Sequence, residues 1–150
     1  MRVRINDALK TAIKDQDKIR SATLRLIMAA VKDRDIAARS DDNYDGVSDA
    51  EILDILSKMV RQRNESATTY EEAGRPELAE RERAEISIIE EFLPEQMSAD
   101  DVQAVVAKTI EALEAQSFKD MGRVMAALKA DYAGEMDFGQ ASAIAKKLLS

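Results

Sequence analysis

This sequence of 150 residues contains no histidine, no cysteine and no tryptophan. Without histidine it lacks the commonest general base and metal ligand of enzymes. Without cysteine it has no disulfides, thiolate nucleophiles or thiolate metal sites. Its five glycines are scattered, so no glycine-rich phosphate loop of the P-loop or dinucleotide type occurs. We therefore expect no catalytic residue, cofactor or metal, although catalysis by carboxylates alone stays open.

Long hydrophobic runs are also missing. No apolar segment approaches the roughly 20 residues that a membrane-spanning helix needs. The first residues, Met1-Arg-Val-Arg-Ile-Asn-Asp7, lack the apolar stretch of a signal peptide. The sequence therefore predicts a soluble cytoplasmic protein that makes no membrane contact.

What the chain does contain is typical of helices. Ala, Glu, Leu, Lys and Arg dominate, aromatic residues make up only 4%, and charged residues make up 34%. Apolar residues recur every three or four positions, which predicts an all-α fold. The expected helices cover about residues 5–15, 17–38, 48–73, 76–92, 98–113, 119–132 and 137–148. The polar segment 40–46 reads as a mobile loop.

Glycine and proline predict how these helices are arranged. Gly74 ends one long helix and Pro76 begins the next, which predicts a helical hairpin. The hairpin is charged near its turn and apolar near its base, so its tip should project from an N-terminal helical bundle as an arm. Pro94 ends the fourth helix. We expect an N-terminal subdomain, 1–93, followed by a small three-helix C-terminal subdomain, 94–150.

Four segments follow one another in the order and spacing of a known family. They are Arg61-Gln-Arg-Asn-Glu-Ser66, Gly74-Arg-Pro-Glu-Leu-Ala79, Phe92-Leu-Pro-Glu-Gln96 and Lys119-Asp-Met-Gly-Arg-Val-Met125. On these segments the chain resembles the YqeY-like (GatB/YqeY) family over essentially its whole length. These proteins are free-standing relatives of the tail domain of GatB, the B subunit of the glutamine-dependent aminoacyl-tRNA amidotransferase. One position departs from the pattern, since Ala126 stands where many relatives carry a second glycine.

The resemblance implies a two-subdomain helical fold and a non-catalytic accessory role. In the amidotransferase the tail helps to hold tRNA, while ATP use and amide transfer take place elsewhere. The partner implied here is therefore tRNA or a tRNA-handling, amidotransferase-like complex. Two alternatives stay open: a protein-interaction module that docks on an enzyme partner, and a component linked to carbon–nitrogen ligase activity with glutamine as amido-N donor. A protein without enzymatic activity of its own is favoured.

Charge distribution supplies the first set of candidate RNA contacts. The net charge is −7, but residues 1–39 contain ten Lys or Arg against five Asp or Glu, which leaves −12 for the remainder. Within this basic stretch, cations recur every seven residues, so they share one slowly turning helix face. They are Lys18, Arg25, Lys32 and Arg39. The alternative is an ordinary solvated face, neutralised by Asp33, Asp35 and neighbouring helices.

The second candidate surface belongs to the C-terminal subdomain. Lys119 and Arg123 are four residues apart, which predicts one helix face for both, and Lys129 follows. Lys146 and Lys147 on the last helix adjoin this set, but cations near a helix C-terminus are also explained by the helix dipole. Gly122 sits inside the predicted helix at a cost of roughly 1 kcal/mol, which indicates that another backbone comes close there. Aromatic residues able to stack on bases are few, and Tyr70, Tyr132 and Phe138 are the candidates.

Arg63 has a separate interpretation. It lies four residues after Met59 and so falls on the apolar stripe of its helix. An arginine in such a place normally pairs with a carboxylate, and Glu85 or Glu90 on the returning helix are available. An ion pair that fixes the register of the hairpin is favoured over an RNA contact.

Overall fold

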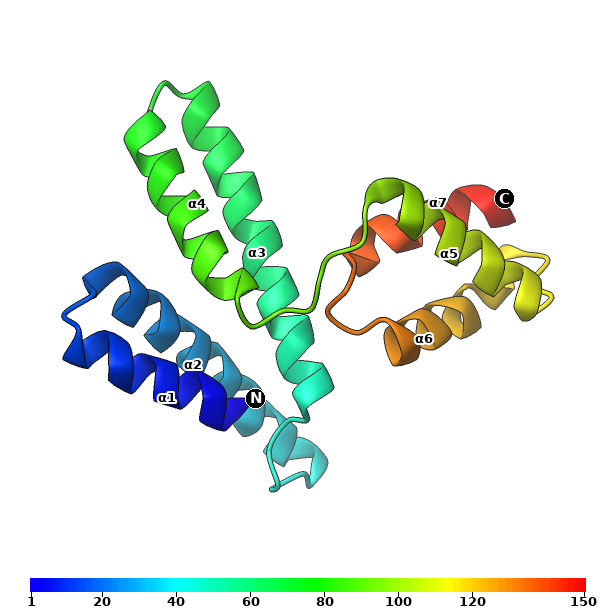
Figure 1. Cartoon of the computed structure of the whole chain (residues 1–150). Coiled ribbons are helices and arrows are strands. Elements are labelled where there is room, and N and C mark those ends of the chain that lie inside the picture. Colours follow the sequence, from blue (N-terminus) through cyan, green and yellow to red (C-terminus); the bar gives the residue numbers. More distant parts are fainter. The chain divides into compact units, whose positions relative to one another are not determined.

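The computed structural model describes residues 1–150 and contains seven α-helices, two short 3-10 helices and no strand (Figure 1). The all-α fold class predicted from the sequence is confirmed. None of the helices is both long and apolar enough to cross a bilayer. The chain divides into two compact units, Met1–Leu93 and Pro94–Ser150, each described by itself below as the N-terminal and the C-terminal unit.

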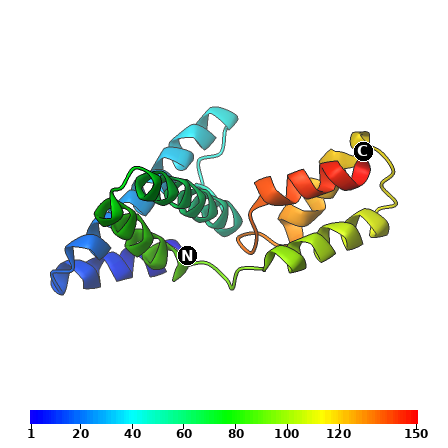
Figure 2. The same ribbon diagram turned by 90° about the horizontal axis from the view of Figure 1, so that it is seen from above.

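The N-terminal unit is built from two helical pairs. Helices α1 (Arg2–Lys14) and α2 (Lys18–Ala38) run antiparallel, and the 3-10 helix η1 (Arg39–Asp41) leads on to the hairpin of α3 (Asp49–Glu72) and α4 (Pro76–Glu90) (Figures 1 and 2). Helix α2 packs against both α1 and α4. The core between the pairs contains the fully buried side chains Ile5, Leu24, Ile27, Ile52, Leu56 and Ile89.

The long hairpin follows from local sequence signals. The Ser48 hydroxyl accepts a hydrogen bond from the Glu51 amide at 3.2 Å and so caps the start of α3. Gly74 adopts a φ of +71°, and Pro76 opens α4. In the outer half the helices pack through the buried alanines Ala67 and Ala79. Figure 1 shows that this half extends beyond α1 and α2.

The loop after α2 is held at its far end. The Val47 amide donates to the Asp35 carboxylate at 2.8 Å, and Arg2 donates to the Val47 carbonyl at 3.3 Å. Gly46 has a φ of +89°, and a Cβ at this position would lie 2.9 Å from the Arg2 guanidinium. The positive φ favours glycine, and a side chain here would also displace the Arg2 guanidinium. The sequence predicts a mobile loop for residues 40–46. In the structure, η1 orders the start of this segment and the hydrogen bonds at Val47 hold its end.

The C-terminal unit packs three helices around a second core. They are α5 (Ala99–Ala112), α6 (Met121–Asp131) and α7 (Phe138–Leu149), with the 3-10 helix η2 (Phe118–Asp120) directly before α6. The buried core contains Val102, Val106, Val124, Leu128, Met136, Ala141, Ala145 and Leu149. The Met97 amide donates to the Glu135 carbonyl at 2.8 Å, which fastens the segment before α5 to the loop before α7.

Three sequence expectations need correction. The sixth helix begins at Met121 rather than at Lys119, because η2 occupies the preceding turn. The apolar spacing of residues 137–148 predicts that Leu148 faces inward, but it is exposed, because the buried face of α7 runs through Ala141, Ala145 and Leu149 at four-residue spacing. Ile13 is also exposed, in the last turn of α1, although it continues the stripe of Ile5.

Candidate nucleic-acid interface

The outer face of α2 presents a row of cations. Lys18, Arg25 and Lys32 are all exposed, and none of the three makes an ion pair or side-chain hydrogen bond. Arg39, one step further in η1, is also exposed and interacts electrostatically with Asp35. Seven residues of α-helix rise about 10 Å, so the row spans some 30 Å. Lys18 occupies the first position of α2, where the helix dipole disfavours a cation.

Other arginines of this unit are engaged differently. Arg20 pairs with Glu91, and Arg34 lies 3.9 Å from Asp54. Arg4 donates to the Glu91 carbonyl at 2.6 Å and lies over the Phe92 ring, 5.0 Å from its centroid. The Arg20 and Arg4 contacts fasten α2 and α1 to the end of α4, and the Arg34 pair joins α2 to α3. Arg25 makes no ion pair or side-chain hydrogen bond, so its positive charge has no structural role within the chain.

A hollow of about 470 Å³ lies beside the second half of this row. Its lining combines apolar side chains, Met28 and Ile36, with the cations Lys32 and Arg39. The single acid in the lining is Asp35, which the Arg2 guanidinium neutralises from both of its terminal nitrogens. The Arg2 hydrogen bond and that of the Val47 amide lower the pKa of Asp35 from 3.8 to about 2, so it is ionised at neutral pH. The lining of the hollow therefore contains Lys32 and Arg39 together with one carboxylate that Arg2 already pairs.

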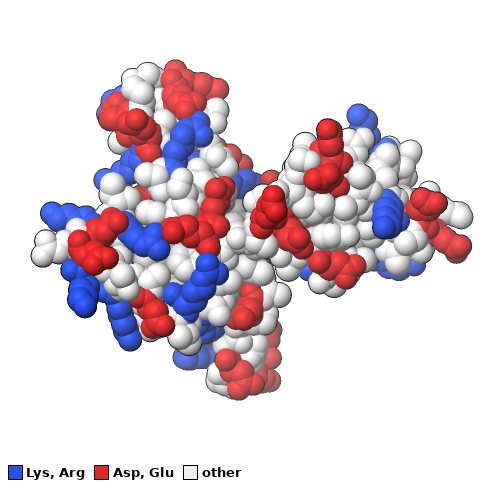
Figure 3. All heavy atoms as spheres, in the orientation of Figure 1, with Lys and Arg blue, Asp and Glu red and all other residues white.

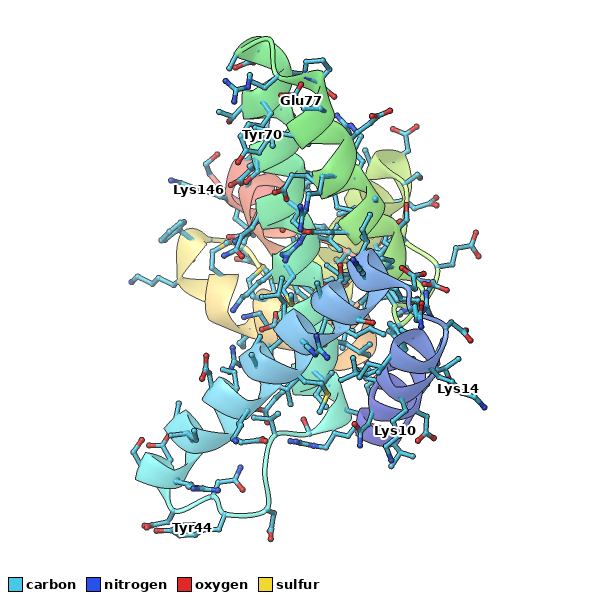
Figure 4. The ribbon with its side chains drawn as sticks, turned by 90° about the vertical axis from the view of Figure 1, so that its left-hand side faces the viewer. Lys10, Lys14, Tyr44, Tyr70, Glu77 and Lys146 are labelled. Atoms are coloured by element: carbon cyan, nitrogen blue, oxygen red, sulfur yellow. The ribbon has the colours of Figure 1, made fainter.

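Charge on the N-terminal unit is unevenly distributed. In Figure 3, Lys and Arg are prominent over α1 and α2, with some Asp and Glu among them, whereas Asp and Glu are prominent at the tip of the α3–α4 hairpin. Lys10 and Lys14 extend from α1 into solvent, and Tyr70 and Glu77 lie toward the hairpin turn (Figure 4). The tip pairs several of its own charges, with Arg83 on Glu71 and Arg75 on Glu77. An anionic partner therefore meets a favourable field over α1 and α2, and not at the arm.

In the C-terminal unit the candidate cations differ in their surroundings. Lys119 is exposed in η2, and Lys129 is exposed in the last turn of α6; neither makes an ion pair. Arg123 donates to the Asp120 carboxylate at 3.0 Å and to the Leu113 carbonyl at 3.4 Å. Hydrogen bonds from the Gln116 amide, the Arg123 side chain and the Ser117 amide lower the pKa of Asp120. Arg123 is thus held in place, while the other two are free to bind an anion.

Gly122 needs a different explanation from the one the sequence suggests. It lies in the first turn of α6 rather than inside a longer helix, so the cost of a glycine in a helix interior does not apply in full. Apart from its chain neighbours and the backbone of its own helix, nothing in the chain lies within 4 Å of a Cβ built at this position. No backbone of the same chain therefore packs there, and the surface at Gly122 is bare.

Sequence reasoning missed Phe118, which is 60% exposed beside Lys119. The aromatic candidates it named, Tyr70, Tyr132 and Phe138, are all partly covered. The sequence contains one sign of this exposure: Phe118 belongs to the apolar stripe of neither the fifth nor the sixth predicted helix, so neither helix is expected to bury it.

Arg63 and Glu85 meet across the hairpin. The Arg63 Nε lies 3.0 Å from the Glu85 carboxylate, with side-chain exposures of 14% and 12%. Arg63 also donates to the Met59 carbonyl at 3.4 Å, and Arg81 approaches Glu85 at 3.6 Å. Glu85, rather than Glu90, is the partner of Arg63. The pair faces its own hairpin, which leaves Arg63 unavailable to an external phosphate.

Comparison with known proteins finds relatives in yeasts. Three are named "Altered inheritance of mitochondria protein 41, mitochondrial". The Candida glabrata protein is 29% identical over 71% of this chain and 58% of its own length. The Meyerozyma guilliermondii protein is 34% identical over 57% of this chain and 42% of its own length. The Lachancea thermotolerans protein is 32% identical over 57% of this chain and 43% of its own length. The chain thus spans about half the length of these curated relatives.

These names correct one expectation. The cytoplasmic location predicted from composition is wrong by this comparison, because the relatives are named mitochondrial proteins. The lack of cysteines and of long apolar runs does not distinguish one aqueous compartment from another.

The family itself is shown by a match over nearly the whole chain. The family model described as "Yqey-like protein" matches residues 2–149, a range that includes both units and every candidate residue above. The chain belongs to the YqeY-like protein family.

Proposed function

We propose that this protein binds tRNA without acting on it chemically, and that the cation row of α2 and the exposed lysines beside α6 hold its phosphates. The observation that carries the proposal is the state of Lys18, Arg25 and Lys32. Acidic residues outnumber basic ones by 29 to 22, yet these three cations have no carboxylate partner. Phosphate contacts of this kind position a nucleic acid without reading its sequence.

The hollow beside α2 supports the same function. Lys32 and Arg39 are among the residues that line it, and the neighbouring acid, Asp35, is already paired with Arg2. A phosphate placed there meets two cations and no free carboxylate. The overall charge of −7 opposes any general attraction to RNA, so the contacts must be local.

The experiment is a titration of tRNA with the full chain at several salt concentrations. The test variant is Lys18→Glu/Arg25→Glu/Lys32→Glu. Each phosphate contact contributes roughly 0.7–0.9 to the slope of log affinity against log salt. We expect the wild type to bind at low salt and the variant to bind far more weakly, with a slope reduced by about 2–3.

The matched control is Lys108→Glu/Lys146→Glu/Lys147→Glu, which changes the net charge equally at exposed lysines of α5 and α7. Weaker binding of the α2 variant alone supports the proposal. If the control loses as much affinity as the test variant, the α2 row has no special role. If the wild type fails to bind tRNA at low salt, the function itself is refuted.

A protein partner is the second candidate, and one observation favours it. Ile19, Leu26 and Ile36 are about half exposed along α2 between the cations. Apolar docking depends little on salt, whereas phosphate binding weakens steeply. The salt slope of the first titration therefore separates the two functions.

A further inference from the structure

Phe118 is the one phenylalanine that the fold leaves uncovered. Phe92 is 3% exposed in the core of the N-terminal unit, and Phe138 packs against the core of the C-terminal unit. Phe118 is 60% exposed, in the 3-10 turn before α6. A single exposed apolar side chain is common on protein surfaces, so exposure alone gives Phe118 no role, and its surroundings decide.

The backbone that carries Phe118 is fixed on both sides. Ser117 caps the turn, and the Asp120 carboxylate accepts hydrogen bonds from the amides of Gln116 at 2.9 Å and Ser117 at 3.3 Å. Arg123 donates to the same carboxylate from the first turn of α6. The ring is therefore presented from a rigid turn, and an aromatic side chain with two torsions loses little entropy when it is covered.

The first two turns of α6, which follow Phe118 in the sequence, include two exposed positions with little or no side chain. Gly122 follows Phe118 by about one helical turn, and beyond its chain neighbours and its own helix backbone no atom lies within 4 Å of where its Cβ would be. Ala126, one turn further along α6, is small and exposed. These two exposed positions of α6 therefore carry no bulky side chain.

Positive charge stands next to the ring. Lys119 follows Phe118 directly and has no ion pair, and the charge of Asp120 is compensated by Arg123 and two amides. An aromatic face beside a free cation matches a nucleotide, which combines a flat base with a phosphate. Base stacking on an aromatic side chain tolerates any base, because every base has a π face.

We propose that Phe118 stacks on an unpaired base of the bound RNA and that Lys119 holds the phosphate adjoining that base. This inference rests on the proposed function. It adds a contact that distinguishes RNA with unpaired bases from fully paired RNA. Double-stranded RNA keeps its bases inside the helix and offers no such face.

The absence of tryptophan makes a direct test possible. Phe118→Trp places the only indole of the protein at the proposed stacking position. We expect its fluorescence to be quenched when tRNA or a single-stranded oligonucleotide is added, and to change little with a fully paired duplex. The control is Leu148→Trp, which places an indole at an exposed position of α7 beside two lysines, and it should not be quenched.

Affinity supplies the second readout. Phe118→Ala should weaken tRNA binding by about 5- to 150-fold, the fold-change that corresponds to the loss of one stacked base. Phe118→Trp should restore it. Because the side chain is exposed, both variants should keep the helical circular dichroism of the wild type.

The outcomes separate the inference from the function on which it rests. If tRNA binds, but the indole of the Phe118→Trp variant is not quenched and Phe118→Ala binds like the wild type, stacking is refuted and RNA binding stands. Equal quenching by paired duplex also refutes it, since no base is then free to stack. If the wild type does not bind RNA at low salt, both fail.

Discussion

At the scale of single residues, the Asp35 carboxylate joins three segments of the N-terminal unit. It accepts hydrogen bonds from Arg2 in α1 at 2.8 Å and from the Val47 amide in the loop before α3 at 2.8 Å, while it belongs to α2 itself. These bonds lower its pKa from 3.8 to about 2. The folded protein thus binds this proton less tightly than the unfolded chain does, and the carboxylate stabilises the fold wherever it is ionised.

The pH dependence of stability follows from that sign. The contribution of Asp35 is complete above pH about 4 and is lost as the pH falls toward about 2. The urea midpoint of Asp35→Asn should therefore lie below that of the wild type at neutral pH, and the gap should close over this range. Asp33→Asn, at an exposed residue without an ion pair, is the control and should show no such gap. A gap that stays constant down to pH about 2 would contradict the assignment.

Residues also mark where prediction from the sequence ends. The cations of α2 could be assigned to one face because a helix has a fixed period, and all four are exposed. Whether each one meets a carboxylate depends on which elements pack beside it, and no local pattern contains that information. Phe118 was missed for the same reason, since its exposure is decided by where α6 begins and by what the three helices cover.

At the scale of elements, the α3–α4 hairpin shows how one ion pair fixes the register of two helices. Arg63 and Glu85 are mostly buried between the helices, so removal of one partner leaves the other poorly solvated. Arg63→Ala should lower the free energy of unfolding by about 2 kcal/mol, the value of a hydrogen bond to a charged group. Urea denaturation of the full chain measures it.

Two further variants identify the cause. Arg63→Met/Glu85→Leu removes both charges and should stay within about 1 kcal/mol of the wild type. Arg75→Ala breaks a pair at the hairpin tip whose side chains are 62% and 65% exposed, and should cost less than about 0.5 kcal/mol. An equal loss from Arg63→Ala and Arg75→Ala would show that burial of the pair has no effect.

The sequence predicts the helices and their ends better than it predicts which side chains are exposed and unpaired. The cap at Ser48 and the turn through Gly74 and Pro76 are local signals, because their chemistry involves neighbours within four residues. The start of α6 was placed two residues early, since a 3-10 turn and an α-helix share the same apolar spacing over so short a range. The anchor at Val47 joins residues far apart in the sequence, so segment 40–46 gave no sign of it.

At the scale of the whole molecule, each unit has its own hydrophobic core. Leu56 lies in the core of the N-terminal unit and Leu128 in that of the C-terminal unit, both fully buried. A domain of about 60 residues buries only about 60% of the surface of its unfolded chain, so the smaller C-terminal unit should be the less stable of the two. We propose that the two units unfold independently.

Hydrogen exchange of the full chain tests this independence. Leu128→Ala should destabilise its unit by about 2–5 kcal/mol. The amides of α5, α6 and α7 should then exchange much faster, while those of α2 and α3 keep the protection they have in the wild type. Leu56→Ala should give the reverse pattern, with the loss confined to α1 to α4. Loss of protection in both units from either substitution would mean that they unfold as one cooperative body. The loss of RNA binding in a destabilised variant could then not be assigned to one surface. Separate responses would instead allow the α2 row and Phe118 to be tested one at a time.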